Sequence, residues 1–180
     1  MRKLRYSVAM SLDGYIAGPN GESDWITMDP EIDFTGLFEQ FDTFLLGRRT
    51  FEAMSTAGQQ GTPGTKTFIF SRTLRQQDYP AVTIIAEEAV ETVAALRAES
   101  GKDIWLFGGG ALFRSLLDAQ LVDTVEVAVM PVLLGSGIPL LPPPANQMKL
   151  KLTSHKVYEK TGIVSLRYTI EYKRLKQARK

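Results

Sequence analysis

The chain has 180 residues, 44% hydrophobic and 23% charged, a composition that indicates one globular domain and excludes collagen-like and disordered classes. It contains no cysteine and one histidine, which excludes disulfides, thiolate zinc sites, iron–sulfur clusters and a two-histidine metal site within one chain. No apolar run approaches the roughly 20 residues of a membrane helix, and the basic N-terminus lacks the apolar stretch of a signal peptide. We therefore expect a soluble, cytoplasmic protein that does not bind membranes.

Strand and helix signals alternate along the chain, which predicts a single α/β domain over residues 1–180. Short apolar runs predict strands at residues 6–10, 43–46, 67–70, 82–85 and 104–107. Apolar residues at helical spacing predict one helix over residues 87–99 and another directly after Gly110.

After Gln120 the pattern changes to strict alternation. Val125, Val127 and Val129 share one face of a predicted strand, and residues 164–172 repeat the pattern after a turn at 158–162. Such strands, with one buried and one wet face, are typical of antiparallel sheets. We predict a mixed, mostly parallel central sheet with flanking helices, an antiparallel C-terminal hairpin, and a long loop over 131–144.

The net charge of +1 is unevenly distributed, because residues 149–180 hold ten Lys or Arg against two Glu. A basic end is typical of nucleic-acid-binding proteins. Four of these basic residues alternate with apolar ones, so we interpret them as the solvated face of a sheet, and residues 173–180 as a frayed tail; the four are Lys149, Lys151, Arg167 and Lys173. His155, in the same stretch, is interpreted as an exposed strand residue. We expect no nucleic-acid partner.

The predicted strand at 104–107 runs through Gly108, Gly109 and Gly110 directly into a helix. Glycines let a ligand approach the backbone closely, and the unpaired N–H groups of a helix N-terminus favour an anion such as pyrophosphate. The spacing is not that of the GxGxxG fingerprint, and a tight turn needed only for packing is the alternative.

Two further predicted strands end in residues that suit a phosphate. LLGRRTFE (45–52) places Gly47, Arg48, Arg49 and Thr50 after one strand, and FIFSRT (68–73) places Ser71 and Arg72 after the next. Because open α/β sheets bind ligands at the carboxyl ends of their strands, these residues predict one phosphate-bearing ligand, a nucleotide.

Acidic residues precede a helix that we expect to begin at Phe34. Asp29, Glu31 and Asp33 suit helix capping and turn initiation. Alternatively, a carboxyl group here supplies a proton during a reduction. Trp25 is interpreted either as a stacking surface for a flat ring or as part of the core.

Taken in order, several segments resemble the dihydrofolate reductase-like fold, including the reductase domain of riboflavin biosynthesis. They are SLDGYIAG (11–18), GESDWIT (21–27), LLGRRTFE, FIFSRT, WLFGGGALF (105–113) and VMPVLLGSG (129–137). The first two look most like the riboflavin-type pyrimidine reductases, whereas GRRT and SRT look more like dihydrofolate reductase itself.

The resemblance implies an NADPH-dependent oxidoreductase that transfers hydride to a pyrimidine- or pterin-type substrate, similar to 5-amino-6-(5-phosphoribosylamino)uracil reductase. A dihydrofolate reductase-type enzyme and a nucleotide-binding module without catalysis are the alternatives. It also implies a homodimer.

The same resemblance implies roles for individual residues. The nicotinamide would contact Ala9, Ile16 and Ala17, and the 2′-phosphate would contact Arg48, Arg49, Ser71 and Arg72. The pyrophosphate would lie at Thr50 and the turn of Gly108, Gly109, Gly110, Ala111 and Leu112, with Gly47 in the same site. Asp13, Trp25 and Thr27 would face the substrate, and Glu31 and Asp33 are the candidate catalytic acids.

Overall fold

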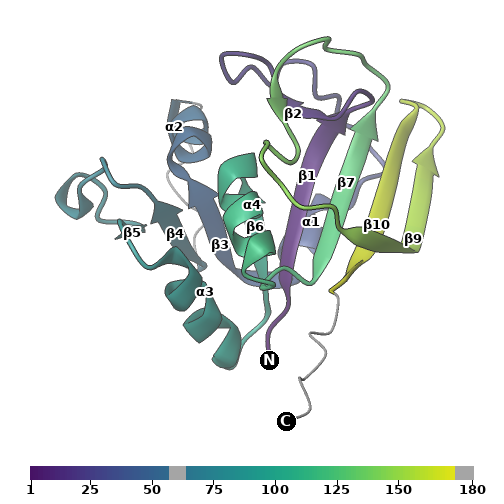
Figure 1. Cartoon of the computed structure of the whole chain (residues 1–180). Helices are drawn as coiled ribbons and strands as arrows, with labels where there is room; N and C mark the ends of the chain where they lie inside the picture. The colour runs from purple at the N-terminus through teal and green to yellow at the C-terminus, as the bar shows by residue number, and fades with distance from the viewer. Residues whose placement is uncertain (57–63, 173–180) are drawn as a thin grey trace.

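A twisted eight-stranded sheet runs through the centre of the computed structural model, which describes residues 1–56 and 64–172 (Figure 1). Its strand order is β5-β4-β3-β6-β1-β7-β10-β9. The strands of this sheet are β1 (Leu4–Ser11), β3 (Phe41–Gly47), β4 (Lys66–Phe70), β5 (Thr83–Ile85), β6 (Asp103–Gly108), β7 (Thr124–Met130), β9 (Lys149–Tyr158) and β10 (Ile163–Glu171). The helices are α1 (Phe34–Phe38), α2 (Arg48–Thr56), α3 (Ala89–Ala98) and α4 (Gly110–Asp118), with a 3₁₀ turn at Gln76–Asp78.

The strands β5, β4, β3, β6, β1 and β7 pair in parallel with one another in this order, whereas β10 is antiparallel to both β7 and β9. The turn between β9 and β10 closes when the Gly162 N–H donates to the Tyr158 carbonyl, and Gly162 takes a positive φ there. The predicted mixed sheet with an antiparallel C-terminal hairpin is confirmed.

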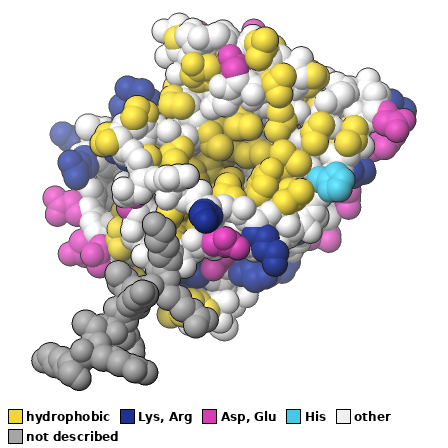
Figure 2. Space-filling model, turned by 45° about the vertical axis from the view of Figure 1, so that its right-hand side comes forward, with side chains coloured by type: hydrophobic (Ala, Val, Ile, Leu, Met, Phe, Trp, Pro, Cys, Tyr) yellow, Lys and Arg dark blue, Asp and Glu magenta, His cyan; other side chains and the backbone are white. Residues whose placement is uncertain are grey.

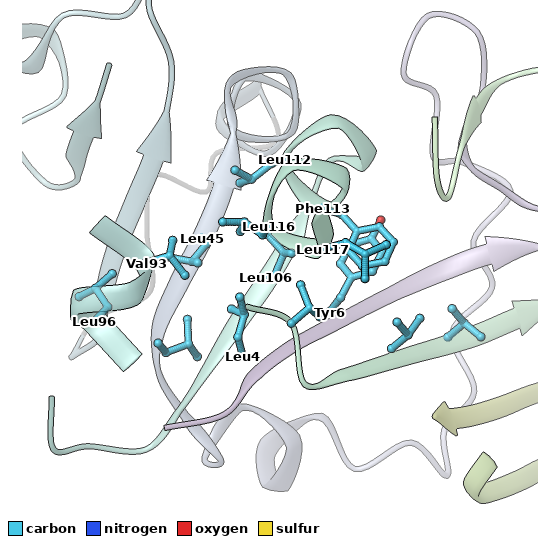
Figure 3. Packing of buried hydrophobic residues seen from close by; sticks show 14 residues of the cluster. Leu4, Tyr6, Leu45, Val93, Leu96, Leu106, Leu112, Phe113, Leu116 and Leu117 are labelled. Atoms are coloured by element: carbon cyan, nitrogen blue, oxygen red, sulfur yellow. The ribbon is translucent and has the colours of Figure 1, made fainter. Parts of the chain in front are cut away.

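The helices cover the two faces of this sheet in pairs. On one face, α3 and α4 bury their apolar residues against β1, β3, β6 and β7, as Figure 3 shows. The Tyr6 ring stacks on Phe113 with centroids 3.9 Å apart. On the other face, α1 and α2 pack on an aromatic cluster that contains Phe44 and Trp105. Both predicted helices are confirmed, although α3 begins at Ala89 rather than at residue 87.

Two expectations about the C-terminal half are wrong. Thr124 and Glu126, assigned to a wet face, are buried, because β7 lies between β1 and β10 and its polar side chains meet those of its neighbours. The loop over 131–144 contains a short strand, β8 (Ile138–Pro139), which pairs with β2 (Tyr15–Ala17). Here a Cβ at Gly137 would lie 2.2 Å from the Ala17 carbonyl oxygen, so glycine is required at that position.

The C-terminal hairpin leaves an apolar face open. Leu150, Leu152 and Val157 of β9 are exposed, and Leu166 of β10 is half-buried. Figure 2 shows hydrophobic side chains gathered in a hollow on this side, with His155 at its edge. His155 is exposed on β9, as its interpretation required.

No described helix is long and apolar enough to cross a membrane. Residues 173–180, predicted to form a frayed tail, lie outside the described residues.

Candidate functional site

A long cleft begins at the carboxyl ends of β3, β4 and β6 and continues over the α1 face of β1, β7 and β10. Its volume is about 2230 Å³. Sites for one small ligand measure about 300–1,000 Å³, so this cleft has room for a dinucleotide and a second molecule beside it. Every residue assigned to the cofactor lines it: Ala9, Ile16, Ala17, Gly47, Arg48, Arg49, Thr50, Ser71, Arg72, Gly108, Gly109, Gly110, Ala111 and Leu112.

The glycine turn joins β6 to α4 in close contact with its surroundings. A Cβ on Gly108 would stand 3.1 Å from the Thr50 hydroxyl oxygen, and one on Gly110 would stand 2.8 Å from the Pro139 carbonyl oxygen. Packing against backbone therefore excludes a side chain at Gly110, whereas at Gly108 the contact is tight and the φ of +156° is one that other residues rarely adopt. Among the residues that the structure describes, no side chain caps α4, whose first residues line the cleft, so its first-turn N–H groups have no side-chain partner there. The packing and ligand-binding interpretations of the turn are thus compatible.

The three arginines at the strand ends differ in their contacts. Arg48 donates to Glu52, four residues later, at 2.9 Å. Arg49 and Arg72 are exposed, and neither has a hydrogen bond or ion pair with any residue that the structure describes. The Ser71 hydroxyl oxygen accepts the Leu74 N–H at 3.0 Å and so stabilises its own loop. The free positive charge at this end of the cleft therefore belongs to Arg49 and Arg72.

Small side chains form the middle of the cleft. Ala9 of β1 pairs with Ala128 of β7, and both line the cleft. Ile16 and Ala17 belong to β2, which pairs with β8, and both line the cleft as well.

The two candidate catalytic acids reach the cleft, each with a structural contact. The Asp33 carboxylate accepts the Gly36 N–H at 2.8 Å and caps α1, which confirms the capping interpretation. Glu31 forms an ion pair with Lys160 at 3.2 Å.

Glu31 and Asp33 lie on a loop that Asp29 attaches to the turn between β9 and β10. Its side chain is 2% exposed and accepts the Thr161 hydroxyl at 2.7 Å and the Glu31 N–H at 2.8 Å. The Thr161 hydrogen bond, followed by that of Glu31, holds the pKa of Asp29 below its ordinary value.

Of the predicted substrate contacts, Thr27 lines the cleft but Asp13 and Trp25 do not. The Asp13 carboxylate accepts the Ser11 hydroxyl at 2.7 Å and the Gly135 N–H at 2.7 Å, and so ties the β1–β2 turn to the loop after β7. The Trp25 indole donates to the Glu22 carbonyl at 3.0 Å. Both side chains serve local structure.

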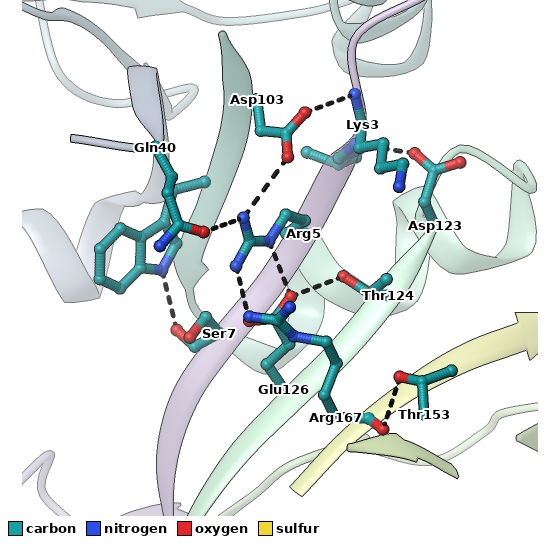
Figure 4. A network of polar contacts seen from close by, with 12 residues as sticks. Lys3, Arg5, Ser7, Gln40, Asp103, Asp123, Thr124, Glu126, Thr153 and Arg167 are labelled. Atoms are coloured by element: carbon teal, nitrogen blue, oxygen red, sulfur yellow. Dashed lines mark hydrogen bonds and ion pairs between the residues drawn. The ribbon is translucent and has the colours of Figure 1, made fainter. Parts of the chain in front are cut away.

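A buried ion network that the sequence does not predict lies where the cleft runs over β1, β7 and β10 (Figure 4). Arg5 of β1 donates to both carboxylate oxygens of Glu126, at 2.7 and 2.9 Å, while Thr124 and Arg167 reach the same group. Burial raises the pKa of Glu126, but the hydrogen bonds and charge of Arg5 outweigh it and hold that pKa below its ordinary value.

Glu126 and Arg167 line the cleft together with Lys156, Tyr158 and Ser165 of the hairpin. Alternation in the sequence assigns Glu126 and Arg167 to a solvated face and Tyr158 falls in the predicted turn, so the sequence does not indicate this wall.

Comparison with known proteins gives consistent matches. The family model of the RibD C-terminal domain matches residues 2–164. The uncharacterized protein YyaP of Bacillus subtilis is 34% identical over 179 residues, which cover 93% of this chain and 94% of that protein.

Solved structures show the same fold. A putative riboflavin biosynthesis protein from Shewanella sp. PV-4 superposes with a TM-score of 0.80 at 24% identity, covering 94% of this chain and 99% of that one. Dihydrofolate reductase from Enterococcus faecalis, complexed with NADP(H), gives 0.70 at 19% identity, covering 94% and 97%. The dihydrofolate reductase-like fold is confirmed.

Proposed function

Because the chain belongs to the RibD C-terminal domain family, a family of reductase-like enzymes, we propose that it is an NADPH-dependent reductase. Its substrate would be a pyrimidine- or pterin-type heterocycle, as in 5-amino-6-(5-phosphoribosylamino)uracil reductase or in dihydrofolate reductase. The observation that supports this proposal is the cleft itself. Three strand ends meet in this cleft, together with two arginines and a helix N-terminus that have no side-chain partner within residues 1–56 and 64–172, and with the alanines Ala9, Ala17 and Ala128.

The proposal assigns a group of lining residues to each part of NADPH. Arg49 and Arg72 would hold the 2′-phosphate, because guanidinium groups bind phosphate through paired hydrogen bonds. Thr50 and the first turn of α4 would hold the pyrophosphate. Ala9 and Ala17 would flank the nicotinamide, whose chemistry when bound is hydride transfer.

The substrate would then lie beyond Ala9, between α1 and the strands β7 and β10. Glu31 and Asp33 stand at this end and are the candidates to supply a proton to the reduced atom. The variants Glu31→Gln and Asp33→Asn would distinguish which of the two acids supplies the proton. Loss of the pH dependence of kcat in one variant, with NADPH affinity unchanged, assigns the role to that residue.

The first experiment is a titration of the protein with NADPH and with NADH, followed by quenching of tryptophan fluorescence, since Trp105 lines the cleft. We expect tighter binding of NADPH. Arg49→Ala and Arg72→Ala should each weaken NADPH binding about 10- to 100-fold, the loss of a charge-assisted hydrogen bond, and leave NADH binding unchanged.

Lys66→Ala is the matched control, because Lys66 is an exposed cation at the opposite end of β4 and pairs with Glu99. It should bind NADPH as the unmodified chain does. Failure of both nucleotides to bind would refute the proposal. Binding without hydride transfer to any reducible heterocycle would instead favour a nucleotide-binding module without catalysis.

The apolar hollow in Figure 2 supports a homodimer. Three exposed hydrophobic side chains on β9 would be covered by a second copy of the chain. Light scattering after size-exclusion chromatography tests this, and a Leu152→Glu variant should be monomeric.

A further inference from the structure

A row of small side chains crosses the sheet where the cleft runs over β1, β7 and β10. Ala9 of β1 pairs with Ala128 of β7, Ala128 pairs with Ser165 of β10, and all three line the cleft. Paired residues of neighbouring strands lie on the same face of a sheet, so the row runs about 10 Å from Ala9 to Ser165, two strand spacings. We call this row the trough.

Larger side chains stand on both sides of the trough. Glu126 lies two residues before Ala128 on the same face of β7, and it pairs with Arg167 of β10, with which it forms an ion pair (Figure 4). Met130 lies two residues after Ala128 and also lines the cleft. The small side chains therefore form a floor between two rows of longer ones.

The outer end of the trough lies at β9. Ser165 pairs there with Lys156, whose Nζ lies 4.3 Å from the Tyr158 ring centroid, and both of these longer side chains line the cleft. The Ser165 hydroxyl has no hydrogen bond with any residue in the described ranges 1–56 and 64–172. Because a hydroxyl can donate one hydrogen bond and accept two, this end offers a polar contact that the described part of the fold does not use.

Small side chains on this face contribute little to the stability of the sheet. Alanine is depleted from strands, because β-branched and aromatic side chains pack better across a strand pair. On the opposite face of β7 the chain has valine at three successive positions, Val125, Val127 and Val129. Alanine and serine in the trough instead keep the space above the sheet open, which suits a flat molecule lying on it.

We propose that Ala128 and Ser165 determine the size of the substrate that the cleft accepts, and that they select a planar heterocycle of two or more fused rings. Its reacting ring would lie at Ala9, and the next ring would extend over Ala128 towards β10. The far edge of the molecule would form a hydrogen bond with the Ser165 hydroxyl. This inference rests on the proposed function for the reaction, but ring binding can be measured without NADPH.

Two ligands that share one ring test the trough. Uracil is a single pyrimidine-2,4-dione ring, and lumazine is the same ring fused to a pyrazine, whose nitrogens accept hydrogen bonds. Both are uncharged in slightly acidic buffer. Titration of the ¹⁵N-labelled full chain, followed by NMR, gives the Kd of each. We expect lumazine to bind about tenfold more tightly, because its second ring covers more of the apolar floor, and to shift the amide resonances of residues 126–130 and 163–167.

Ala128→Val should remove this preference, because two added methyl groups stand where the second ring would lie. Lumazine should then bind only as tightly as uracil, whose own Kd should change by less than about twofold. Valine is a favourable strand residue, so the variant should fold. Ser165→Ala should weaken lumazine about 3- to 10-fold, the loss of one hydrogen bond, and leave uracil binding unchanged.

The matched control is Ser154→Val, because Ser154 is an exposed serine of β9 that does not line the cleft. It should keep both affinities. Equal losses for uracil and lumazine in Ala128→Val would mean that the variant disturbs the sheet rather than the space above it, and would overturn the inference.

The inference is also wrong if lumazine binds the unmodified chain no more tightly than uracil, or if its shifts lie outside residues 126–130 and 163–167. NADPH titration of the same samples reports separately on the proposed function. NADPH binding without a preference for the fused ring overturns only the role of the trough, whereas that preference without NADPH binding overturns only the reductase.

Discussion

Replacement of Glu126 by Gln tests the buried ion pair between β1 and β7. The Glu126 side chain is 10% exposed and the Arg5 side chain 6%. One carboxylate oxygen accepts Arg5 Nε and the Thr124 hydroxyl, and the other accepts Arg5 Nη2. Glutamine has the same shape, but its amide nitrogen can only donate. In either orientation of the amide, an N–H of Arg5 therefore faces another N–H, and the buried guanidinium loses the nearer of its two counter-charges and keeps only Asp103, at 3.4 Å.

Loss of one partner from a buried ion pair costs about 3–5 kcal/mol. Domains are stable by about 5–15 kcal/mol, so the Glu126→Gln variant should still fold. At about 2–4 °C per kcal/mol for a chain of this size, its Tm should fall by about 6–20 °C. Urea unfolding at neutral pH measures the free energy directly, with an unchanged m-value as the sign that both states keep their compactness.

Arg167→Gln is the stability control, since Arg167 is 44% exposed and meets the same carboxylate at 3.3 Å. An exposed partner contributes about 0–1 kcal/mol, so this variant should unfold almost as the unmodified chain does.

The effect of Glu126→Gln should also depend on pH. Because the folded-state pKa of Glu126 lies below its ordinary value of 4.5, its stabilisation is complete above 4.5 and is lost as the pH falls through the folded-state value. The difference between the two proteins should therefore shrink in acid. A loss below about 1 kcal/mol at neutral pH, the size expected of an exposed pair, would refute the reasoning.

Three further variants test separate contacts. Tyr6→Phe should stabilise the fold by about 1 kcal/mol in urea, because the Tyr6 hydroxyl is buried without a hydrogen-bond partner among the described residues; a loss of stability would contradict this. Gly110→Ala should cost about 1–3 kcal/mol in thermal unfolding, since its Cβ would meet the Pro139 carbonyl oxygen at 2.8 Å, and an unchanged Tm would show that the loop yields. Asp29→Asn should speed hydrogen exchange at residues 27–33 and 159–161 and nowhere else, because the charged acceptor of Thr161 is lost; exchange spread over the sheet would indicate a global effect.

The part of the cleft at the strand ends, which we propose for the cofactor, could be predicted because its residues are local in the sequence. The glycine turn and the arginine pair each directly follow a buried strand, and parallel strands bring their carboxyl ends to one edge. Short apolar runs, together with parallel pairing, were sufficient to place Gly47, Arg72 and Gly108 at the same end of the sheet.

The part of the cleft beside β7 and the β9–β10 hairpin, which we propose for the substrate, could not be predicted in this way, because its contacts join distant parts of the chain. Arg5 and Glu126 are 121 residues apart, and Asp29 and Thr161 are 132 residues apart. The alternation of apolar and polar residues correctly placed Glu126 on one face of β7, but whether that face is exposed to solvent depends on which strands lie beside it. The order β1-β7-β10 supplies Arg5 on one side and Arg167 on the other, and with them the burial of Glu126.

The β9–β10 hairpin and the strand ends contribute separate groups of residues to the cleft. The β9–β10 hairpin carries Lys156 and Arg167, and its turn holds the loop of Glu31 and Asp33 through Thr161 and Lys160. A change in the hairpin would therefore move the loop of Glu31 and Asp33, whereas the residues proposed to hold the nucleotide belong to other elements, at the carboxyl ends of β3, β4 and β6.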